Sequence, residues 1–224
     1  MKFGSGFWFA VLCASGFIAT RSHSYEAGDS EAEGSAVEIE IATHNFIAHV
    51  LVPFWMLPGL GDYICHRRSR IEQTSGTHES LTHILMISST GVGVMTGLFF
   101  EINDSALLIM AASALFHEAI VFWDVAYAQK LRPPSSVEQH IHSFLEVLPF
   151  TALASMSCLH PRAATKLFRW DSPIRRFRLE RKRKKESPAY IASVIILGTF
   201  ALALPYAEEF IRCFKVDRTL LPRG

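Results

Sequence analysis

Carboxylate and histidine side chains recur in this sequence at a separation of four residues. Among these pairs are Asp62/His66, Glu79/His83 and Glu138/His142, which lie in or at the edges of apolar segments. Residues four apart lie on the same face of an α-helix, so the two members of a pair can point to one place. Carboxylate oxygen and imidazole nitrogen are ligands of iron, manganese and zinc in proteins. The spacing therefore predicts helices that each offer two metal ligands from one face.

Other ionisable residues extend this pattern. His117 and Asp124 are seven residues apart and also share a helix face, Glu118 adjoins His117, and Glu146 lies one turn beyond His142. All lie in or beside apolar segments, where an ionisable side chain is costly and by default marks a functional site. The predicted metal ligands are Asp62, His66, Glu79, His83, His117, Glu118, Asp124, Glu138, His142 and Glu146.

The elements that must position these side chains are long apolar segments. Five are present, at residues 45–66, 81–100, 105–128, 137–159 and 190–206. Each is close to the ~20 residues that a helix needs to cross a bilayer, and none shows the alternation of a strand. The sequence predicts an all-α integral-membrane helical bundle. Residues 44–159 would form four antiparallel spans around the polar site, with Asp104 or Ser105 as the N-cap of the third; residues 189–207 would form a fifth span.

The order of the spans brings the paired residues to one level of the membrane. One pair ends the first span, the next begins the second, another lies toward the end of the third, and the last begins the fourth. In an up-and-down bundle these four positions lie on the same side. Four-helix bundles hold two iron or manganese ions between inward-facing Glu and His residues. We therefore expect two iron ions, with manganese or zinc as alternatives, and expect the surplus residues to orient the ligands.

Two of the carboxylates have alternative explanations that remain open. The segment Ser135-Ser-Val-Glu138 has the pattern of a capping box, in which Glu138 would bind backbone N–H groups at a helix start. Glu79 lies near an expected helix N-terminus and could interact with the helix dipole alone. His78 lies beside a loop and His140 roughly opposite His142, so neither is predicted as a ligand.

Two short histidine motifs resemble those of a known enzyme class. The segment His78-Glu-Ser-Leu-Thr-His83 has the H-x4-H form of the first box in the membrane histidine-box di-iron enzymes, the fatty-acid desaturases and hydroxylases. The segment Gln139-His-Ile-His142 resembles a later box. The resemblance covers only these stretches and implies a di-iron membrane oxidoreductase of the oxygenase or desaturase type. In its ligand balance the site is also similar to soluble ferritin-like di-iron bundles.

The segments outside the bundle carry charge or targeting features. Residues 1–20 resemble a signal peptide or an uncleaved signal anchor, and residues 21–43 form an acidic segment that we expect to be flexible. Residues 160–188 are predicted as a basic loop that attracts anionic lipid headgroups, with eleven Lys or Arg between 162 and 185. Residues 208–224 are predicted as a C-terminal tail.

Membrane orientation stays open, because the basic loop and the N-terminal segment predict opposite sides for the site. The expected location is an integral membrane, either a cell inner membrane or an organelle membrane.

The predicted function is a metal-dependent membrane oxidoreductase that acts on a membrane lipid or another apolar small molecule, with an electron donor or partner subunits. A metal-assisted hydrolase is one alternative. Another is a non-catalytic membrane subunit whose cluster binds haem or relays protons, although haem needs only two histidines and the surplus of carboxylates counts against it. The sequence has no Gly-rich phosphate loop, no nucleophile elbow and no CxxC pair. The basic loop is more typical of lipid contact than of nucleic-acid binding.

Overall fold

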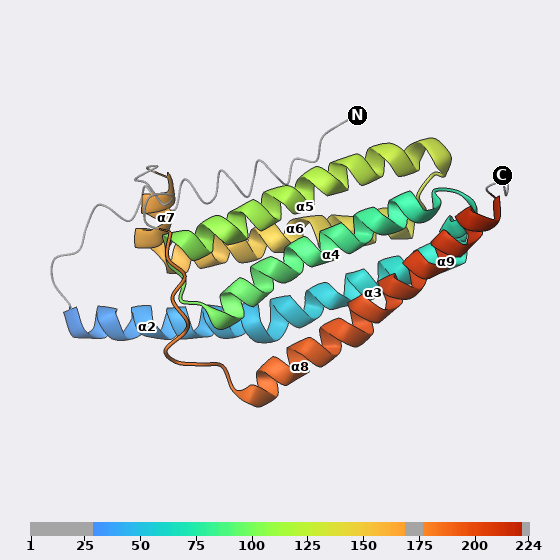
Figure 1. Ribbon diagram of the computed structural model, residues 1–224. Coiled ribbons are helices and arrows are strands. Elements are labelled where there is room, and N and C mark those ends of the chain that lie inside the picture. The colour runs from blue at the N-terminus through green and yellow to red at the C-terminus, as the bar shows by residue number, and fades with distance from the viewer. Residues whose placement is uncertain (1–28, 169–176, 221–224) are drawn as a thin grey trace.

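The computed structural model describes residues 29–168 and 177–220, and the regular elements in these ranges are helices (Figure 1). In this part of the chain five helical rods are long and apolar enough to cross a membrane: Val37–Ser69, Gly76–Phe99, Asp104–Leu131, Ser136–Leu159 and Pro188–Thr219. The all-α membrane bundle expected from the sequence is therefore confirmed. The predicted signal peptide or anchor at residues 1–20 lies outside the described residues.

The first rod is a continuous helix made of α2 (Asp29–Phe46), the π-helical turn η1 (Ile47–Leu51) and α3 (Val52–Ser69). A proline lacks the N–H that would continue the helix, and its ring crowds the carbonyl four residues earlier. For Pro53 that carbonyl belongs to His49, which lies inside η1. The wider π-helical turn accommodates the proline without ending the helix.

Helix α2 begins at Asp29, inside the segment expected to be flexible. Because α2 continues directly into η1 and α3, each of its residues extends an existing helix and does not have to nucleate a new one. The first rod is therefore longer than the hydrophobic pattern indicates.

The next three rods are α4 (Gly76–Phe99), α5 (Asp104–Leu131) and α6 (Ser136–Leu159). They are joined by short turns, so that successive rods run in opposite directions (Figure 1). Helix α4 packs against α5, helix α3 packs against α6, and α5 also contacts α6. Ends of α3 and α5 consequently lie at the same end of the bundle as the starts of α4 and α6.

The N-cap of α5 is Asn103, whose side-chain oxygen accepts a 2.9 Å hydrogen bond from the backbone N–H of Ala106. This corrects the expectation that Asp104 or Ser105 would be the cap. Asn103 has an extended backbone (φ −111°, ψ −177°), so it stands just before the first helical residue and its amide oxygen reaches the unpaired N–H of the first turn.

The connection between α6 and the fifth rod contains the short helix α7 (Pro161–Phe168) and an extended basic segment at residues 177–187. This segment crosses the end of α4. The backbone N–H of Lys182 donates to the carbonyl of Phe99 at 3.0 Å, and the N–H of Glu101 donates to the carbonyl of Glu180 at 2.8 Å. The predicted basic loop is thus attached to the bundle by backbone hydrogen bonds.

The fifth rod is made of α8 (Pro188–Gly198), the π-helical turn η3 (Thr199–Ala203) and α9 (Leu204–Leu220). Here too a π-helical turn stands just before a proline, Pro205. The rod runs past residue 207, where we expected a tail to begin, because the charged residues of α9 make contacts with the bundle. Asp217, for example, accepts a 3.2 Å hydrogen bond from the backbone N–H of Thr77.

Apolar and polar side chains are distributed as expected for helices in lipid. Large apolar side chains face outward along the rods, and Phe116, Trp123 and Phe200 are each more than half exposed, at 52%, 57% and 67%. Charged side chains instead gather in the interior at one end of the bundle, where α3, α4, α5, α6 and α9 meet. The hydrocarbon phase would thus contact apolar groups, while the polar groups lie where helices can satisfy them.

Candidate metal centre

The polar interior lies at the end of the bundle that is to the right in Figure 1, where α3 ends and α4 begins. Six of the predicted ligands are at most 2% exposed there: Asp62, His66, Glu79, His83, Asp124 and Glu138. His142 joins them at intermediate exposure. Burial this complete of so many ionisable groups is rare unless they are paired or bind a metal.

His66 stands at the centre of the cluster. Its Nε2 atom is 3.3 Å from Oδ1 of Asp62, 3.8 Å from Oε1 of Glu79 and 3.4 Å from Oε1 of Glu138. Two groups of side chains that could hold a metal ion share this histidine, with one ligand atom from each member within 4.8 Å of the others. The groups are Asp62, His66, Glu138 and His142, and His66, Glu79 and His83.

Glu209 of α9 connects the two central histidines. Its Oε2 atom is 3.1 Å from Nδ1 of His66, and its Oε1 atom is 3.2 Å from Nδ1 of His83. The two imidazole rings stack with centroids 4.4 Å apart and planes 12° apart. A carboxylate at Nδ1 holds the proton on that nitrogen and leaves Nε2 as the lone-pair atom, the arrangement that metal-binding histidines adopt.

The Nε2 atoms of His66 and His83 are both buried, and neither makes a hydrogen bond. Each nevertheless points toward carboxylates, since Nε2 of His83 is 3.5 Å from Oδ2 of Asp124. A buried ring nitrogen with no hydrogen bond is costly in a folded protein. Two such atoms that face carboxylate oxygens could serve as metal ligands.

Arg132 closes one side of the cluster from the turn between α5 and α6. Its Nη2 atom is 2.5 Å from Oε1 of Glu79 and 2.6 Å from Oε1 of Glu138, and only 7% of the residue is exposed. Burial alone would lower the pKa of Arg132, but hydrogen bonds to Glu138 and Glu79 raise it above its usual value. The guanidinium is therefore a permanent positive charge inside the site.

The other polar groups of the cluster are held by protein contacts as well. Nε2 of His142 is 2.8 Å from Oδ1 of Asp62, whose Oδ2 accepts a 3.0 Å hydrogen bond from the hydroxyl of Tyr206. The hydroxyl of Thr82 donates to Oδ1 of Asp124. Such contacts fix the directions in which the carboxylates point, as the residues around metal ligands do.

Glu138 and Glu79 both lie at helix starts, as the two alternative explanations from the sequence required, and both also belong to the polar cluster. Glu138 completes a capping box with Ser135, and it also binds Arg132 and faces His66. Glu79 lies in the first turn of α4 and also binds Arg132. A place at a helix start thus positions these carboxylates without excluding them from the site.

Three predicted residues lie apart from this network. His117 is buried, but its Nδ1 atom is 3.1 Å from both the Thr90 hydroxyl and the Met86 carbonyl. Glu118 and Glu146 are partly buried, and neither belongs to the two candidate groups found among the described residues.

The sequence reasoning did not single out Glu209, Arg132 or Tyr206. A signal for Glu209 exists in the helical spacing of Leu202, Tyr206, Glu209 and Cys213, which form one buried stripe. That stripe continues the fifth rod beyond the point where hydropathy falls. Arg132 carries no comparable signal, because only the folding of the turn brings it to Glu79.

The formal charge of the cluster limits what can occupy it. Five buried carboxylates and one buried guanidinium leave a charge of −4 when the histidines are neutral: Asp62, Glu79, Asp124, Glu138 and Glu209, with Arg132. Protonation of His66, His83 and His142 would still leave −1. Two divalent cations would offset the charge completely with the histidines neutral, as metal binding requires.

Comparison with known proteins yields no relative, since no protein-family model, curated protein or solved structure matches this chain. What the chain has in common with other proteins is therefore its architecture and its chemistry: it is an all-α membrane bundle with a buried histidine–carboxylate group that could hold a metal ion.

Proposed function

We propose that this chain binds two divalent iron ions in the buried cluster and oxidises an apolar substrate within the membrane. The observation that carries the proposal is the pair of imidazoles, His66 and His83, whose Nδ1 atoms bind one carboxylate while their Nε2 atoms face others without a hydrogen bond. Nitrogen and carboxylate oxygen in a four-helix setting are the ligands of di-iron and di-manganese proteins.

The two ions would share the residues according to their positions. One ion would be held by Asp62, His66, Glu138 and His142, which form the larger candidate group. The other ion would be held by His83, Glu79 and Asp124. Arg132 and Glu209 would orient these ligands by hydrogen bonds to their outer atoms.

A cavity of about 40 Å³ lies beside this centre, and it would take the reacting end of an apolar substrate but not the whole molecule. Its walls combine ligand candidates, among them Asp62 and His83, with apolar side chains such as Met86 and Leu145. Iron would supply dioxygen activation at such a place. Hydroxylation of a C–H bond would consume O₂ with two electrons and two protons from a reduced carrier. One oxygen atom would enter the C–OH product, and the other would leave as water.

Elemental analysis of the detergent-purified full chain tests the metal site. Wild-type protein, purified without chelator or loaded with ferrous iron under anaerobic conditions, should retain about two ions per chain. His66→Ala should lose at least the ion of the larger group, because Nε2 of His66 is one of the four ligands proposed for that ion. The matched control is His78→Ala, on the first turn of α4, where the ring stacks on Tyr127 at 3.9 Å and lies outside those groups. Equal metal content in the two variants, or none in the wild type after loading, would contradict the proposal.

A second candidate is a proton-relay or purely structural network, and it is favoured by the protein partners that the carboxylates already have. Arg132, Tyr206 and Thr82 each bind cluster carboxylates without any metal. This alternative predicts metal-free protein whose fold survives His66→Ala. Haem fits less well, because the stacked rings of His66 and His83 leave no space between them for a porphyrin.

A further inference from the structure

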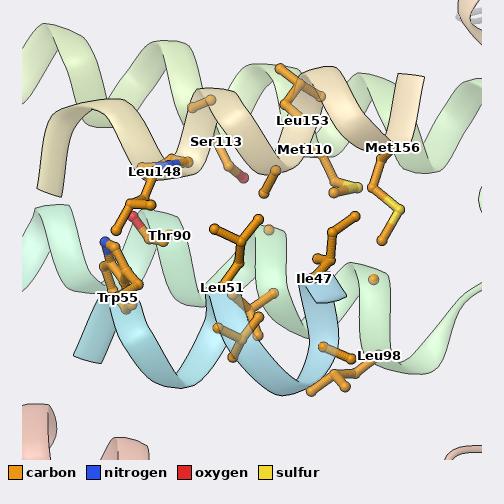
Figure 2. Close-up of a pocket in the computed structure, with 18 of the residues that line it drawn as sticks. Ile47, Leu51, Trp55, Thr90, Leu98, Met110, Ser113, Leu148, Leu153 and Met156 are labelled. Carbon is orange, nitrogen blue, oxygen red and sulfur yellow. The ribbon is translucent and has the colours of Figure 1, made fainter. Parts of the chain in front are cut away.

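A second, larger cavity lies in the other half of the bundle. It measures about 100 Å³, several times the ~10–15 Å³ that one water molecule needs. Figure 2 shows its walls: Ile47, Leu51 and Trp55 of the first rod on one side, with residues of α4, α5 and α6 around the rest. Apolar side chains dominate the lining, and a cavity of that kind takes apolar ligands readily.

The hollow arises from small residues at positions that face it. On α4, an added Cβ at Gly97 would meet no atom within 4 Å, and one at Gly93 would meet only the Cβ of Ser113, at 3.9 Å. Ala114 of α5 and Ala152 of α6 also line the space. Membrane bundles use small residues to bring helices into close contact, but here the helices leave the space open.

The inner end of this cavity adjoins the candidate metal centre. Trp55 lines both the large cavity and the small cavity beside the cluster. Thr90 lines the large cavity and lies 3.1 Å from His117, which lines the small one together with Asp124. The two cavities therefore adjoin one another along the bundle, with Trp55 in the wall of both.

The outer end of the large cavity carries charged groups of the basic segment. Lys182 and Glu186 line it with His44, and Nζ of Lys182 is 3.0 Å from Oε1 of Glu186. Further along the segment lie exposed cations: Arg178, Arg181, Arg183, Lys184 and Lys185. These exposed cations, which flank the Lys182–Glu186 pair in the chain, give this segment an excess of positive charge that is complementary to an anionic headgroup.

The length of the large cavity matches one leaflet of a bilayer. His44 and Trp55 are eleven positions apart (55 less 44), which corresponds to roughly 16 Å at ~1.5 Å per residue. Half of a hydrocarbon core of ~30 Å is about the same. A chain anchored at Lys182 would thus reach Trp55 with its far end.

We propose that this cavity holds the hydrocarbon chain of a long-chain fatty acid, with the carboxylate at Lys182 and the methyl end beside Trp55, facing the metal centre. Only one part of this inference rests on the proposed function, namely that the bound fatty acid is also the substrate that is oxidised. In that arrangement the carbons near the methyl end reach the site of oxidation, and those near the carboxylate do not.

Quenching of Trp55 fluorescence in the full-length protein in detergent micelles tests this arrangement. The probes are two fatty acids of equal length, one with a nitroxide near the methyl end and one with it near the carboxylate. The Trp55 contribution is the wild-type signal less the signal of Trp55→Phe, since the chain has four tryptophans, and the methyl-end probe should quench this contribution more strongly. Equal quenching by both probes would overturn the proposed orientation.

Variants on α4 separate the cavity from general partitioning into detergent. Gly97→Leu should fill the space and reduce quenching at least tenfold, whereas Gly91→Leu should leave it unchanged, because Gly91 is on the same helix but not in the lining. If Gly97→Leu does not fold, Ala152→Leu on α6 serves the same purpose. Unchanged quenching in a folded cavity-filling variant would overturn the proposal.

Lys182→Gln tests the headgroup. It should weaken fatty-acid binding by about tenfold or more, because a charge-assisted hydrogen bond is lost, and it should leave binding of the long-chain alcohol of equal length nearly unchanged. An equal effect on both ligands would exclude recognition of the carboxylate.

Metal content, measured on the same samples, separates this inference from the proposed function. Retained metal without specific quenching would refute the fatty-acid cavity alone. Specific quenching without metal would refute the metal centre alone.

Discussion

The first half of helix α4 faces a buried polar cluster, and its second half faces an apolar cavity. Its first turns bury Glu79, Ser80 and His83 among charged partners, whereas its second half presents Gly93 and Gly97 to an open apolar cavity. One end of the molecule is thus filled with polar groups that fix one another, and the other end is hollow. Separate halves of the same helices thus provide closely held polar side chains at one end and room for an apolar molecule at the other.

The largest difference between the halves should appear when the buried charge is disturbed. Arg132→Met leaves Glu79 and Glu138 without their cation, so metal-free protein should lose about 3–5 kcal/mol of stability. The control is Arg67→Met, whose side chain is 53% exposed and pairs with Glu208, and it should cost less than ~1 kcal/mol. Thermal unfolding followed by circular dichroism measures both.

Equal stability of Arg132→Met and Arg67→Met would contradict this prediction. Glu79 and Glu138 would then have to be neutral or hydrated in the protein. The closed network described for the polar end would then be wrong.

A smaller effect is expected from the carboxylate that orients the two histidines. Glu209→Gln can no longer accept hydrogen bonds from two Nδ1 atoms, because its amide nitrogen is only a donor. Loss of such an orienting partner typically weakens metal binding 10–100-fold. Glu208→Gln is the adjacent control, since Glu208 is 42% exposed and bonds to Tyr63 and Arg67 outside the cluster. Competition with a chelator of known affinity gives the two values, and identical affinities would remove Glu209 from the site.

Parts of this architecture follow from local sequence patterns, and other parts do not. The rods and the pairs such as Asp62/His66 were predictable, because hydropathy and a spacing of four residues are properties of a short segment. The same periodicity gave His117 a shared face with Asp124, but it does not give depth. Seven residues are roughly 10 Å of helix, which places His117 beyond the cluster.

The residues that sequence reasoning missed depend on contacts between distant segments. Glu209 lies beyond the apolar stretch of the fifth rod, so hydropathy alone ends the span too early. Its side chain is completely buried because it meets His66 and His83 from another part of the chain. Arg132 lies in a turn whose path brings it to Glu79, and no local pattern encodes that path.

The smallest predicted effect compares two glycines, one in each kind of packing. Gly97→Ala should stabilise the protein by about 1 kcal/mol, because the methyl group enters open space and alanine favours helix over glycine. Gly59→Ala should destabilise it, because the new Cβ would overlap with Cδ2 of Leu202, a side chain only 4% exposed. The helix preference of about 1 kcal/mol offsets only part of an overpacking cost of about 1–3 kcal/mol.

Thermal unfolding of the Gly97→Ala and Gly59→Ala variants measures both effects, and the same substitution should change the free energy of unfolding in opposite directions at the two positions. Should both variants be stabilised, Leu202 must be free to move, and the packing between the first and fifth rods would be looser than described. Should both be destabilised, the space beside Gly97 would be occupied in the protein. A bound hydrocarbon chain that resists extraction would produce that second outcome, and delipidated protein would then recover the stabilising effect at Gly97 while Gly59→Ala stayed destabilising.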